Sequence, residues 1–463
     1  MLHNHRIKLL CAAFTLAAAA SAQTAPKLRA DNIDEVLHAM TLEEKAQLLV
    51  GDGNAGFVGS GAMLGHQSRL VAGAAGQTVS IARLGIPATV LTDGPAGVHI
   101  DPKREGTTAT FYATGFPVGT CLASTWNPQL VYNVGQAMGK ETLEYGCDVI
   151  LGPGLNIQRN PLGGRNFEYY SEDPLVTGII GAAMIRGIQS QGVGTSPKHF
   201  AVNSQEGDRT RVDERVSQRD RVDAILVAWQ PGEEGGNSVA DVLTGKVNPS
   251  GHLTATWPVS ISDDPSTDNF PQSPVYYNFT DKFAGGNLKG VNYSNHEEDI
   301  YVGYRYYDTF GRKPAYPFGY GLSYTTFDFS KLSAKKSGDN IVVTVSVKNT
   351  GKVAGKQVAQ VYVAAPKGNL EKPAKELKAF AKTRLLQPGE SETLTMTIPV
   401  RDLASFDSKD SQWLADAGTY TFLAGDNVEH TTQKATLKLG EYTEKTSDAL
   451  PLNVSLNLLK TKN

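Results

Sequence analysis

The chain has 463 residues, of which 40% are hydrophobic and 20% charged, and its formal net charge is -3. This composition is that of a globular protein long enough for two or three domains. The nearly balanced charge gives no reason to expect a nucleic acid or an anionic membrane surface as a partner.

The first 22 residues have the charge order of a secretory signal peptide. Residues 3–8 are basic, residues 9–20 are apolar and small, and residues 20–22 read Ala-Ser-Ala, which fits the cleavage rule. A buried helix, the alternative, does not need that order. We therefore expect a secreted or periplasmic protein, without a membrane span elsewhere because no other stretch approaches ~18 apolar residues.

Cleavage would remove Cys11 and leave Cys121 and Cys147 in an oxidising compartment. Two cysteines do not make a disulfide scaffold. A Cys121–Cys147 bond and two buried thiols both stay open.

Two scaffold helices are predicted near the start of the mature chain. Ile33, Val36 and Met40 follow helical spacing, and Thr41-Leu-Glu-Glu at 41–44 is a capping box that opens a second helix ended by Gly51. Residues 51–76 are rich in Gly and Ala without clear periodicity, which predicts a long loop.

A β-prone run at residues 87–92 delivers Asp93 at its end into Gly-Pro-Ala-Gly, which breaks the strand. An aspartate in that place is either a turn former or a ligand for sugar hydroxyls. The local sequence alone favours the turn.

The next segment alternates helices and strands. Asn127-Pro128 predicts a helix start, residues 147–151 form an apolar strand, apolar residues between 176 and 188 repeat the helical period, and a further strand begins at residue 193. This order predicts parallel βαβ units.

Polar residues follow two of these strands. A loop rich in Gly and Pro after residue 151 carries Arg159, Arg165 and Glu168, and Lys198-His199 follows the next strand. Loops at strand ends are where α/β folds place ligands.

The region after residue 208 changes character. Nine of the fifteen residues from 209 to 223 are charged, which is typical of a solvated surface segment. A strand at 224–229, a loop at 232–236 and a helix at 238–243 then form one βα unit of another α/β layer. Residues 262–298 are too long for an ordinary connection and are either a binding loop or poorly packed.

From about residue 323 the hydrophobic period becomes two. Strands are predicted at 340–347, 357–363, 393–398 and 418–423, with turns such as Asn-Thr-Gly at 349–351 between them. Repeated short strands with such turns indicate a β-sandwich. Because its strands are local and complete, we expect it to be the most independently stable part of the chain.

Several motifs together resemble glycoside hydrolase family 3, the β-glucosidase and β-xylosidase group. The central motifs are Arg-Asn-Pro-Leu-Gly-Gly-Arg-Asn-Phe-Glu at 159–168, Ser-Glu-Asp-Pro at 171–174 and Lys-His-Phe at 198–200. The others are Leu-Thr-Asp-Gly-Pro-Ala-Gly at 91–97, Pro-Gly-Glu-Glu-Gly-Gly-Asn at 231–237, Gly-Tyr-Arg-Tyr-Tyr at 303–307 and Pro-Phe-Gly-Tyr-Gly-Leu-Ser at 317–323.

The resemblance implies an α/β plus all-β architecture in which the first part is incomplete. Residues 33–220 number 188, whereas a (β/α)8 barrel typically needs ~250. The expected organisation is a signal peptide at 1–22, a truncated barrel-type domain at 31–220, a truncated α/β sandwich domain at 221–322, a fibronectin type III-like β-sandwich at 323–440 and a tail at 441–463.

The resemblance also implies a retaining mechanism, which needs two carboxyl groups about 5–5.5 Å apart. The family nucleophile is an Asp, usually in a Ser-Asp-Trp context, and the acid/base is usually a Glu on a loop of the second domain. This chain contains no Ser-Asp-Trp, and residues 212–220 nearly abut 222–229 where the segment with both groups is expected. The catalytic residues are therefore unknown, and Glu233 and Glu234 are poor substitutes.

The substrate-binding half is still present. By resemblance, Asp93, Arg165, Lys198 and His199 hold sugar hydroxyls, and Arg159 is a further candidate. Vicinal hydroxyls are well matched by an acceptor carboxylate opposed by fixed cationic donors. Many family members have an Arg six residues after the Asp, where this chain has His99. A neutral imidazole lacks that fork of donors. Glu168 is interpreted as an anchor for an arginine.

Two functions therefore compete. The first is a secreted hydrolase, impaired or inactive, that acts on terminal β-D-glucosyl or related residues of a β-linked oligosaccharide or an aryl or alkyl glycoside, without metal or cofactor. The second is a non-catalytic sugar-binding remnant or deletion product. A third, remote reading is an adhesion module built on residues 323–440. The sequence leaves the oligomeric state open.

Overall fold

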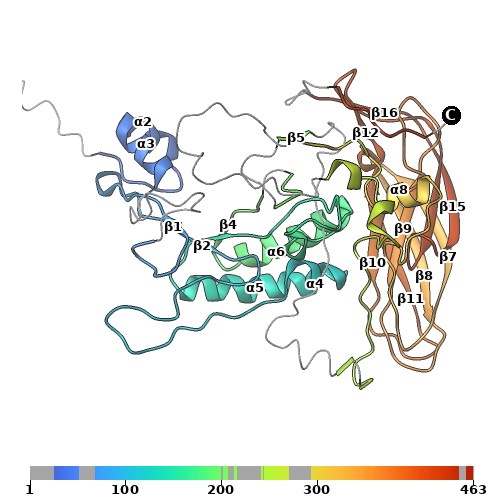
Figure 1. The fold of residues 1–463 in the computed structure, drawn as a ribbon, viewed down its shortest axis with the longest axis horizontal. Helices are drawn as coiled ribbons and strands as arrows, with labels where there is room; N and C mark the ends of the chain where they lie inside the picture. Colours follow the sequence, from blue (N-terminus) through green and yellow to red (C-terminus); the bar gives the residue numbers. More distant parts are fainter. Residues whose placement is uncertain are drawn as a thin grey trace, which may run out of the picture. The chain divides into compact units, whose positions relative to one another are not determined.

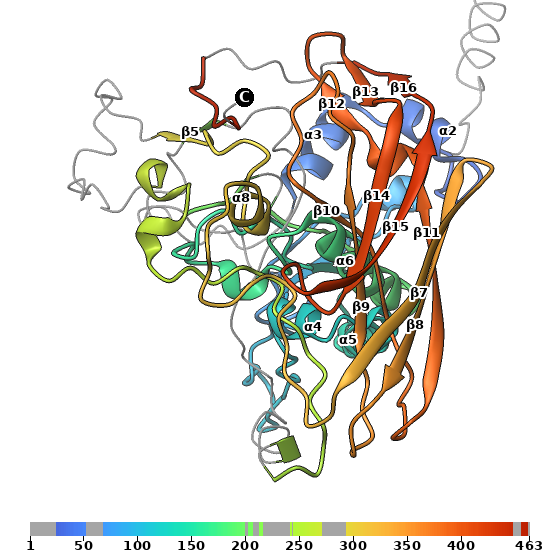
Figure 2. The ribbon, with the colours of Figure 1, turned by 90° about the vertical axis from the view of Figure 1, so that its right-hand side faces the viewer.

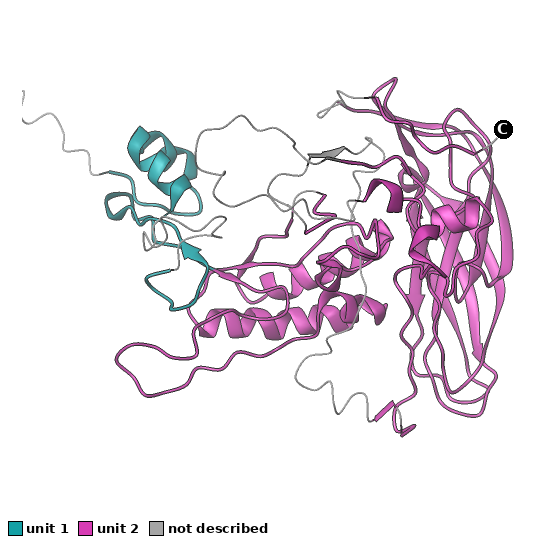
Figure 3. Ribbon diagram, in the orientation of Figure 1, with its two compact units in different colours: residues 1–91 teal, residues 92–463 magenta. Residues whose placement is uncertain are grey.

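The computed structural model describes residues 25–51, 68–199, 202–206, 213–215, 241–242, 244–270, 293–447 and 455–461. The chain divides into two compact units, residues 1–91 and residues 92–463 (Figure 3). The predicted signal peptide, the strand at 224–229 and most of the charged segment lie outside the described residues. The domain boundaries predicted from the sequence stay predictions. None of the described helices is long and apolar enough to cross a membrane.

The first unit contains the two predicted scaffold helices, α2 (Ile33–Ala39) and α3 (Leu42–Val50). Both bonds of the capping box predicted at Thr41 and Glu44 are present, and Gly51 ends α3 at a φ of 83°. A short strand, β1 (Gly76–Gln77), pairs antiparallel with the start of β2 (Val90–Asp93). The predictions for both helices and for the strand before Asp93 are thus confirmed.

The second unit begins with an α/β part. Its elements are α4 (Gly119–Ser124), α5 (Pro128–Glu144), β3 (Val149–Leu151), the short 3-10 helix η2 (Asn166–Glu168), α6 (Pro174–Gln189) and β4 (Gly194–Thr195). β3 and β4 are neighbouring parallel strands, and α6 connects them along the chain. This arrangement confirms the predicted βαβ unit. The described part of this region matches an incomplete barrel.

Helices α5 and α6 lie side by side (Figure 1). Gly135 of α5 faces Gly187 of α6, and a Cβ atom at Gly135 would stand 2.6 Å from the Met184 carbonyl oxygen. Any larger residue there would force the helices apart, so glycine allows their close contact. The Asn127 side chain accepts a hydrogen bond from the backbone N–H of Leu130, as predicted for the start of α5.

The middle of the chain forms short elements against this part. They are η3 (Ile261–Asp263), η4 (Thr267–Asn269), β6 (Tyr293–Asn295) and α8 (Tyr304–Thr309), and β6 pairs in parallel with β5 (Asp213–Arg215). Within the long predicted connection, the described residues 262–270 form two packed turns, in which Ser266 is fully buried. The rest of that connection up to residue 292 lies outside the described residues.

The predicted β-sandwich is confirmed, with more strands than the sequence indicated. The strands are β7 (Phe327–Ser337), β8 (Asn340–Asn349), β9 (Val358–Ala364), β10 (Glu376–Lys382), β11 (Ser391–Pro399), β12 (Ser405–Asp407), β13 (Gln412–Ala415), β14 (Gly418–Gly425), β15 (Thr431–Leu439) and β16 (Tyr442–Lys445). They form antiparallel sheets in the orders β10-β9-β14-β15, β11-β8-β7 and β12-β13-β16 (Figure 2).

Strand β9 is buried on both faces. Ala359, Val361 and Val363 point into the sandwich core, where they meet the alternating apolar residues of β8. Val358 and Tyr362 point the other way and pack in one cluster with residues of α4, α5 and α6. The sandwich and the α/β part therefore share a continuous hydrophobic core.

A buried polar network crosses the same contact. The Glu172 carboxylate accepts hydrogen bonds from the Thr256 backbone N–H and hydroxyl, each at 2.6 Å, and from the Tyr304 N–H at 2.8 Å. Asp173 caps α6 and accepts from the Tyr304 hydroxyl and the Arg305 guanidinium. Three segments far apart in the sequence are thus fixed to one another by two adjacent carboxyl groups.

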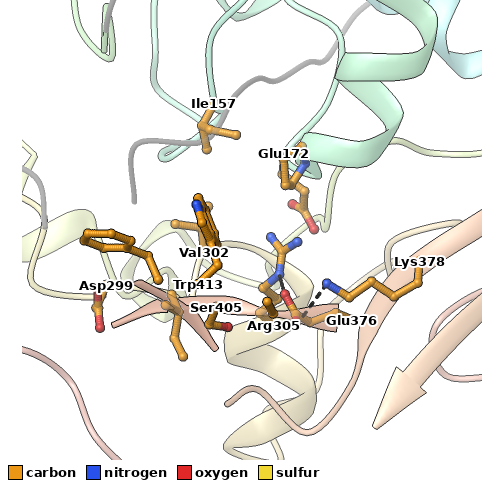
Figure 4. A pocket seen from close by; sticks show the side chains of 13 residues that line it. Ile157, Glu172, Asp299, Val302, Arg305, Glu376, Lys378, Ser405 and Trp413 are labelled. Atoms are coloured by element: carbon orange, nitrogen blue, oxygen red, sulfur yellow. Dashed lines mark ion pairs between the residues drawn. The ribbon is translucent and has the colours of Figure 1, made fainter. Parts of the chain in front are cut away.

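Arg305 continues this network towards the sandwich. Its Nε atom lies 3.5 Å from Glu376 Oε1, and Glu376 in turn pairs with Lys378 on β10 (Figure 4). These side chains and Glu172 line a cavity of about 200 Å³. The neighbouring charges of Lys378 and Arg305 outweigh burial and hold the pKa of Glu376 at about 2, so this group stays ionised.

Cys121 and Cys147 are free thiols in this structure, so no disulfide bond joins them. Cys147 is buried, and burial, followed by the charge of Asp148, raises the pKa of its thiol to about 11. A thiol of that kind is protonated and unreactive at neutral pH.

The pH dependence of stability tests the buried state of Glu172. Burial raises the pKa of this carboxyl to about 7 from its ordinary value of 4.5. Because the folded-state pKa is the higher one, the stabilisation is present below about pH 4.5 and is lost as the pH rises through 7. We expect Glu172→Gln to remove up to about 3 kcal/mol of that decline in the free energy of unfolding, measured by urea unfolding at several pH values. The exposed Glu429→Gln control keeps the full decline, and equal slopes for all three proteins would contradict the assignment.

The Tyr304 hydroxyl provides a second test of the network. It donates to Asp173 and accepts from the backbone N–H of Leu377 on β10, both at 2.9 Å. Tyr304→Phe leaves that buried N–H unpaired and is expected to lower the free energy of unfolding by about 1–3 kcal/mol. Tyr324→Phe, which removes an exposed hydroxyl bound to the Val242 carbonyl, should cost less than about 0.5 kcal/mol. Equal losses in the two variants would argue against the network.

Candidate functional site

The candidate site is built on the segments that follow β2, β3 and β4. Asp93 is the last residue of β2, and Lys198 follows β4 by three residues. Lys198 is held by backbone bonds to the loop after β3, because its N–H donates to the Pro153 carbonyl and its own carbonyl accepts from Leu155. The strands thus deliver the site residues, and the loop after β3 fixes the position of Lys198.

Asp93 and Lys198 form an ion pair. Lys198 Nζ lies 2.5 Å from Asp93 Oδ1, which also accepts the backbone N–H of Gly94 at 2.9 Å. The Asp93 side chain is 46% exposed, and its second carboxylate oxygen, Oδ2, has no hydrogen-bond donor among the described residues. The pair therefore presents an open acceptor beside a fixed ammonium group.

His99 belongs to the turn that follows Asp93. Its backbone N–H donates to the Asp93 carbonyl, and its own carbonyl accepts from the Thr92 hydroxyl. Asp93 is thus a turn residue whose carboxylate also faces solvent, so the two interpretations of this aspartate are compatible.

His199 is oriented by a tyrosine that the sequence analysis did not single out. The Tyr169 hydroxyl lies 3.1 Å from His199 Nδ1 and accepts a hydrogen bond from the Asn203 amide at 2.7 Å. Burial raises the pKa of Tyr169 to about 12, so the hydroxyl keeps its proton. Tyr169 can then donate to Nδ1, which leaves Nε2 to carry the ring proton of a neutral imidazole.

Arg165 lies beside two carboxylates. Its Nε atom makes a hydrogen-bonded ion pair with Glu168 and stands 3.8 Å from Glu206 Oε1. Burial alone lowers the pKa of Arg165, but the hydrogen bond and charge of Glu168 raise it above its usual value. The interpretation of Glu168 as an anchor for an arginine is confirmed. Glu206 also contacts Asn203, which connects Arg165 to the Tyr169 and His199 pair.

Arg159 is placed differently from the other four predicted site residues. Its side chain is 1% exposed and forms an ion pair with Glu298 in which Nε and Oε1 are 2.5 Å apart. The same guanidinium donates to the Ser294 hydroxyl and to the Asn295 carbonyl, both at 2.8 Å. These bonds tie the loop after β3 to β6, so in this structure Arg159 is part of the interior.

The sequence analysis did not single out Tyr169 or Asn203. Tyr169 directly follows Glu168 in the central motif, and Asn203 stands four residues after His199. Polar residues close in sequence to a predicted site residue could therefore have been added to the list of candidate site residues. Glu233 and Glu234 lie outside the described residues. Within the described ranges, no three His, Cys, Asp or Glu side chains are arranged to hold a metal ion.

Three family models match parts of the chain, and the first two matches overlap. The glycosyl hydrolase family 3 N-terminal domain matches residues 42–230, the corresponding C-terminal domain matches 191–324, and a fibronectin type III-like domain matches 357–428. The incomplete barrel followed by a β-sandwich gives this chain the fold of a glycoside hydrolase. The chain belongs to glycoside hydrolase family 3.

Its similar proteins include several β-glucosidases. Beta-glucosidase A of Butyrivibrio fibrisolvens is 43% identical over 234 residues, which cover 46% of this chain and 26% of that protein. Thermostable beta-glucosidase B of Acetivibrio thermocellus is 24% identical over 690 residues, which cover 85% of this chain and 86% of that protein. The chain thus spans about a quarter of the first relative. The second alignment is longer than the 463 residues of this chain, so the relative contains a long segment without a counterpart here.

The fold is similar to that of solved β-glucosidases. Beta-glucosidase 3B from Thermotoga neapolitana, in complex with glucose, matches with a TM-score of 0.80 and 29% identity, over 90% of this chain and all of that chain. A β-glucosidase of Bifidobacterium adolescentis matches with a TM-score of 0.72 and 23% identity, which shows the fold alone.

The two arginines of the loop after β3 should respond differently to substitution. Arg159→Met leaves Glu298 buried without its partner and is expected to lower the free energy of unfolding by about 3–5 kcal/mol, measured by urea unfolding. Arg401→Met is a matched control, since Arg401 pairs with Glu444 at the surface, and it should cost less than about 1 kcal/mol. For Arg165→Met, we expect the loss of free energy of sugar binding to exceed the loss of free energy of unfolding. A stable Arg159→Met protein that no longer binds sugar would reverse this assignment.

Proposed function

We propose that this chain recognises the terminal β-D-glucosyl residue of a β-linked oligosaccharide or of an aryl or alkyl glycoside. The single observation that supports this most strongly is the Asp93–Lys198 pair, an open carboxylate beside an ammonium group next to His199. Family membership and the similarity to β-glucosidases point to the same sugar. We also propose a secreted or periplasmic location, which the composition of the first 22 residues supports.

The chemistry of the side chains suits a pair of neighbouring hydroxyl groups. Asp93 accepts two hydroxyl protons, while the Lys198 ammonium and the imidazole Nε2–H of His199 donate to hydroxyl oxygens. Charge-assisted hydrogen bonds of this kind are stronger than neutral ones. Arg165 is already neutralised by Glu168, so the site as a whole favours a neutral ligand over an anionic one.

We propose further that the chain hydrolyses glycosides poorly or not at all. A retaining hydrolase needs a nucleophilic carboxylate and a proton-donating carboxylic acid about 5–5.5 Å apart. The sequence lacks the Ser-Asp-Trp motif that carries the family nucleophile, and binding groups alone do not replace a nucleophile and an acid.

A second candidate is a hydrolase that uses other carboxylates. The observation in its favour is that Glu168 and Glu206 both lie beside Arg165. Against it, both carboxylates contact the same guanidinium, so neither is placed as an independent nucleophile or proton donor.

Release of nitrophenol from β-glucoside and β-xyloside substrates decides between the two candidates. For purified monodisperse protein we expect turnover far below the ~10 s⁻¹ typical of enzymes. Calorimetric titration should instead detect glucose binding that Asp93→Ala weakens about tenfold or more, since a charged hydrogen-bond partner is lost.

Asp241→Ala is the matched control, because it removes a surface aspartate that pairs with Lys246 and should leave binding unchanged. Turnover near ~10 s⁻¹ that disappears in Asp93→Ala would establish the hydrolase. Undiminished glucose binding by the Asp93→Ala protein would place sugar recognition at other residues.

A further inference from the structure

A groove lies where α4 and the start of α5 meet the sandwich. Its volume is about 750 Å³, and its walls are the two helices, the segment 245–251, the turn between β8 and β9, and the end of β10 with the loop after it. None of its lining residues belongs to the group formed by Asp93, Arg165, Lys198 and His199. The groove therefore has chemistry of its own.

Aliphatic side chains are exposed along this groove. Leu130, Val247, Val353 and Leu385 come from segments far apart in the sequence, and each is between 43% and 49% exposed. A single apolar residue on a surface is ordinary, whereas several apolar residues gathered in one hollow are typical of a binding site. These four residues are called the aliphatic wall.

Two lysines line the groove without a carboxylate beside them. Lys382, at the end of β10, donates to the Thr125 and Ser250 carbonyls at 2.6 and 2.7 Å, and neither bond neutralises its charge. Lys356 is half-buried and has no hydrogen bond or ion pair with any described residue. Burial, followed by the charge of Lys356, lowers the pKa of Lys382 to about 8. The two ammonium groups repel each other, and an anion bound beside them would relieve that repulsion.

The rest of the polar lining is largely occupied. The side chains of Thr125, Asn127 and Asn248 bond to backbone groups of the protein itself. Lys246 pairs with Asp241 at 2.8 Å. The described lining contains no Asp, Glu or aromatic residue, so it lacks both a counter-charge for a cation and a flat ring for a sugar to pack on. The unused features of the groove are its aliphatic wall and the two lysine ammonium groups.

We infer that this groove binds a carboxylate with a medium-length alkyl chain, whose head group lies beside Lys356 and Lys382 and whose chain lies against the aliphatic wall. Charge complementarity selects the head group, because ammonium groups form charge-assisted hydrogen bonds with a carboxylate. The wall selects the chain, since each methylene group removed from water is favourable. The volume lies within the ~300–1,000 Å³ typical of small-molecule sites. This inference does not rest on the proposed recognition of sugar at Asp93.

The test uses decanoate, octanoate and 1-octanol as probes, below their micellar or solubility limits, in calorimetric titrations of the full chain. We expect saturable binding of one decanoate per chain. Octanoate should bind up to about fifteenfold more weakly than decanoate, because two buried methylene groups are lost. The neutral 1-octanol should bind about tenfold more weakly than octanoate, because the charge-assisted hydrogen bonds are lost.

Variants separate the head-group contact from the chain contact. Lys356→Met keeps an aliphatic side chain and removes the charge, so it should weaken decanoate binding about tenfold and leave 1-octanol binding and the thermal midpoint unchanged. Lys352→Met is the matched control, because it removes an exposed lysine of the same turn, and it should change nothing. Leu385→Gln should weaken both decanoate and 1-octanol. Lys382 is kept, since its two bonds hold the end of β10 to the segments of Thr125 and Ser250.

Several results would overturn the inference. They are the absence of saturable decanoate binding, equally tight binding of octanoate and 1-octanol, and decanoate binding that Lys356→Met or Leu385→Gln leaves unchanged. If a second copy of the chain covers the groove instead, sedimentation will show a dimer that Leu385→Gln dissociates, and decanoate will not bind. The Asp93→Ala protein should bind decanoate as the parent protein does, so failure of this site and failure of the sugar site are distinguishable.

Discussion

The structure depends on two adjacent buried carboxyl groups, Glu172 and Asp173. They stand at the start of α6, where Asp173 caps the helix, and they accept hydrogen bonds from Thr256, Tyr304 and Arg305. Buried carboxyls are tolerated only when their oxygens are satisfied, so the segments that provide these donors must stay together. These bonds tie the end of the loop that carries Arg165 and Glu168 to the segments around Thr256 and Tyr304.

The sequence predicted those parts of the fold that rest on local periodicity. The helices at residues 33–50 and the βαβ unit between residues 149 and 195 follow from the spacing of apolar residues and from capping residues. Strand β10 was not predicted. Phe380 interrupts its alternation, and its register with β9 shifts between Leu377 and Ala379, so Leu377 packs with the helices and Ala379 with the sandwich core. The partners of Glu172 are more than 80 residues away in the chain, and no local pattern reveals such pairs.

The candidate site was predictable to the extent that the family motif carries it. Asp93, Lys198 and His199 lie where strand ends put ligands, and the structure joins Asp93 to Lys198. Arg159 and Arg165 stand six residues apart on one loop, yet one is buried against Glu298 and the other is partly open beside Glu206. The difference comes from Glu298, 139 residues further along, which the sequence gives no reason to pair with either arginine.

Strand β9 has consequences for how this architecture can change over evolution. Val358 and Tyr362 face the helices, while Val361 and Val363 face the sandwich. A polar substitution on either face of the strand would therefore lower stability. Gene rearrangements that moved the sandwich to another protein would carry along an apolar surface made for α4 and α6. The sandwich is therefore not an independent domain that can be transferred alone. Substitutions on this face of β9 and on the helices that cover it are expected to be coupled.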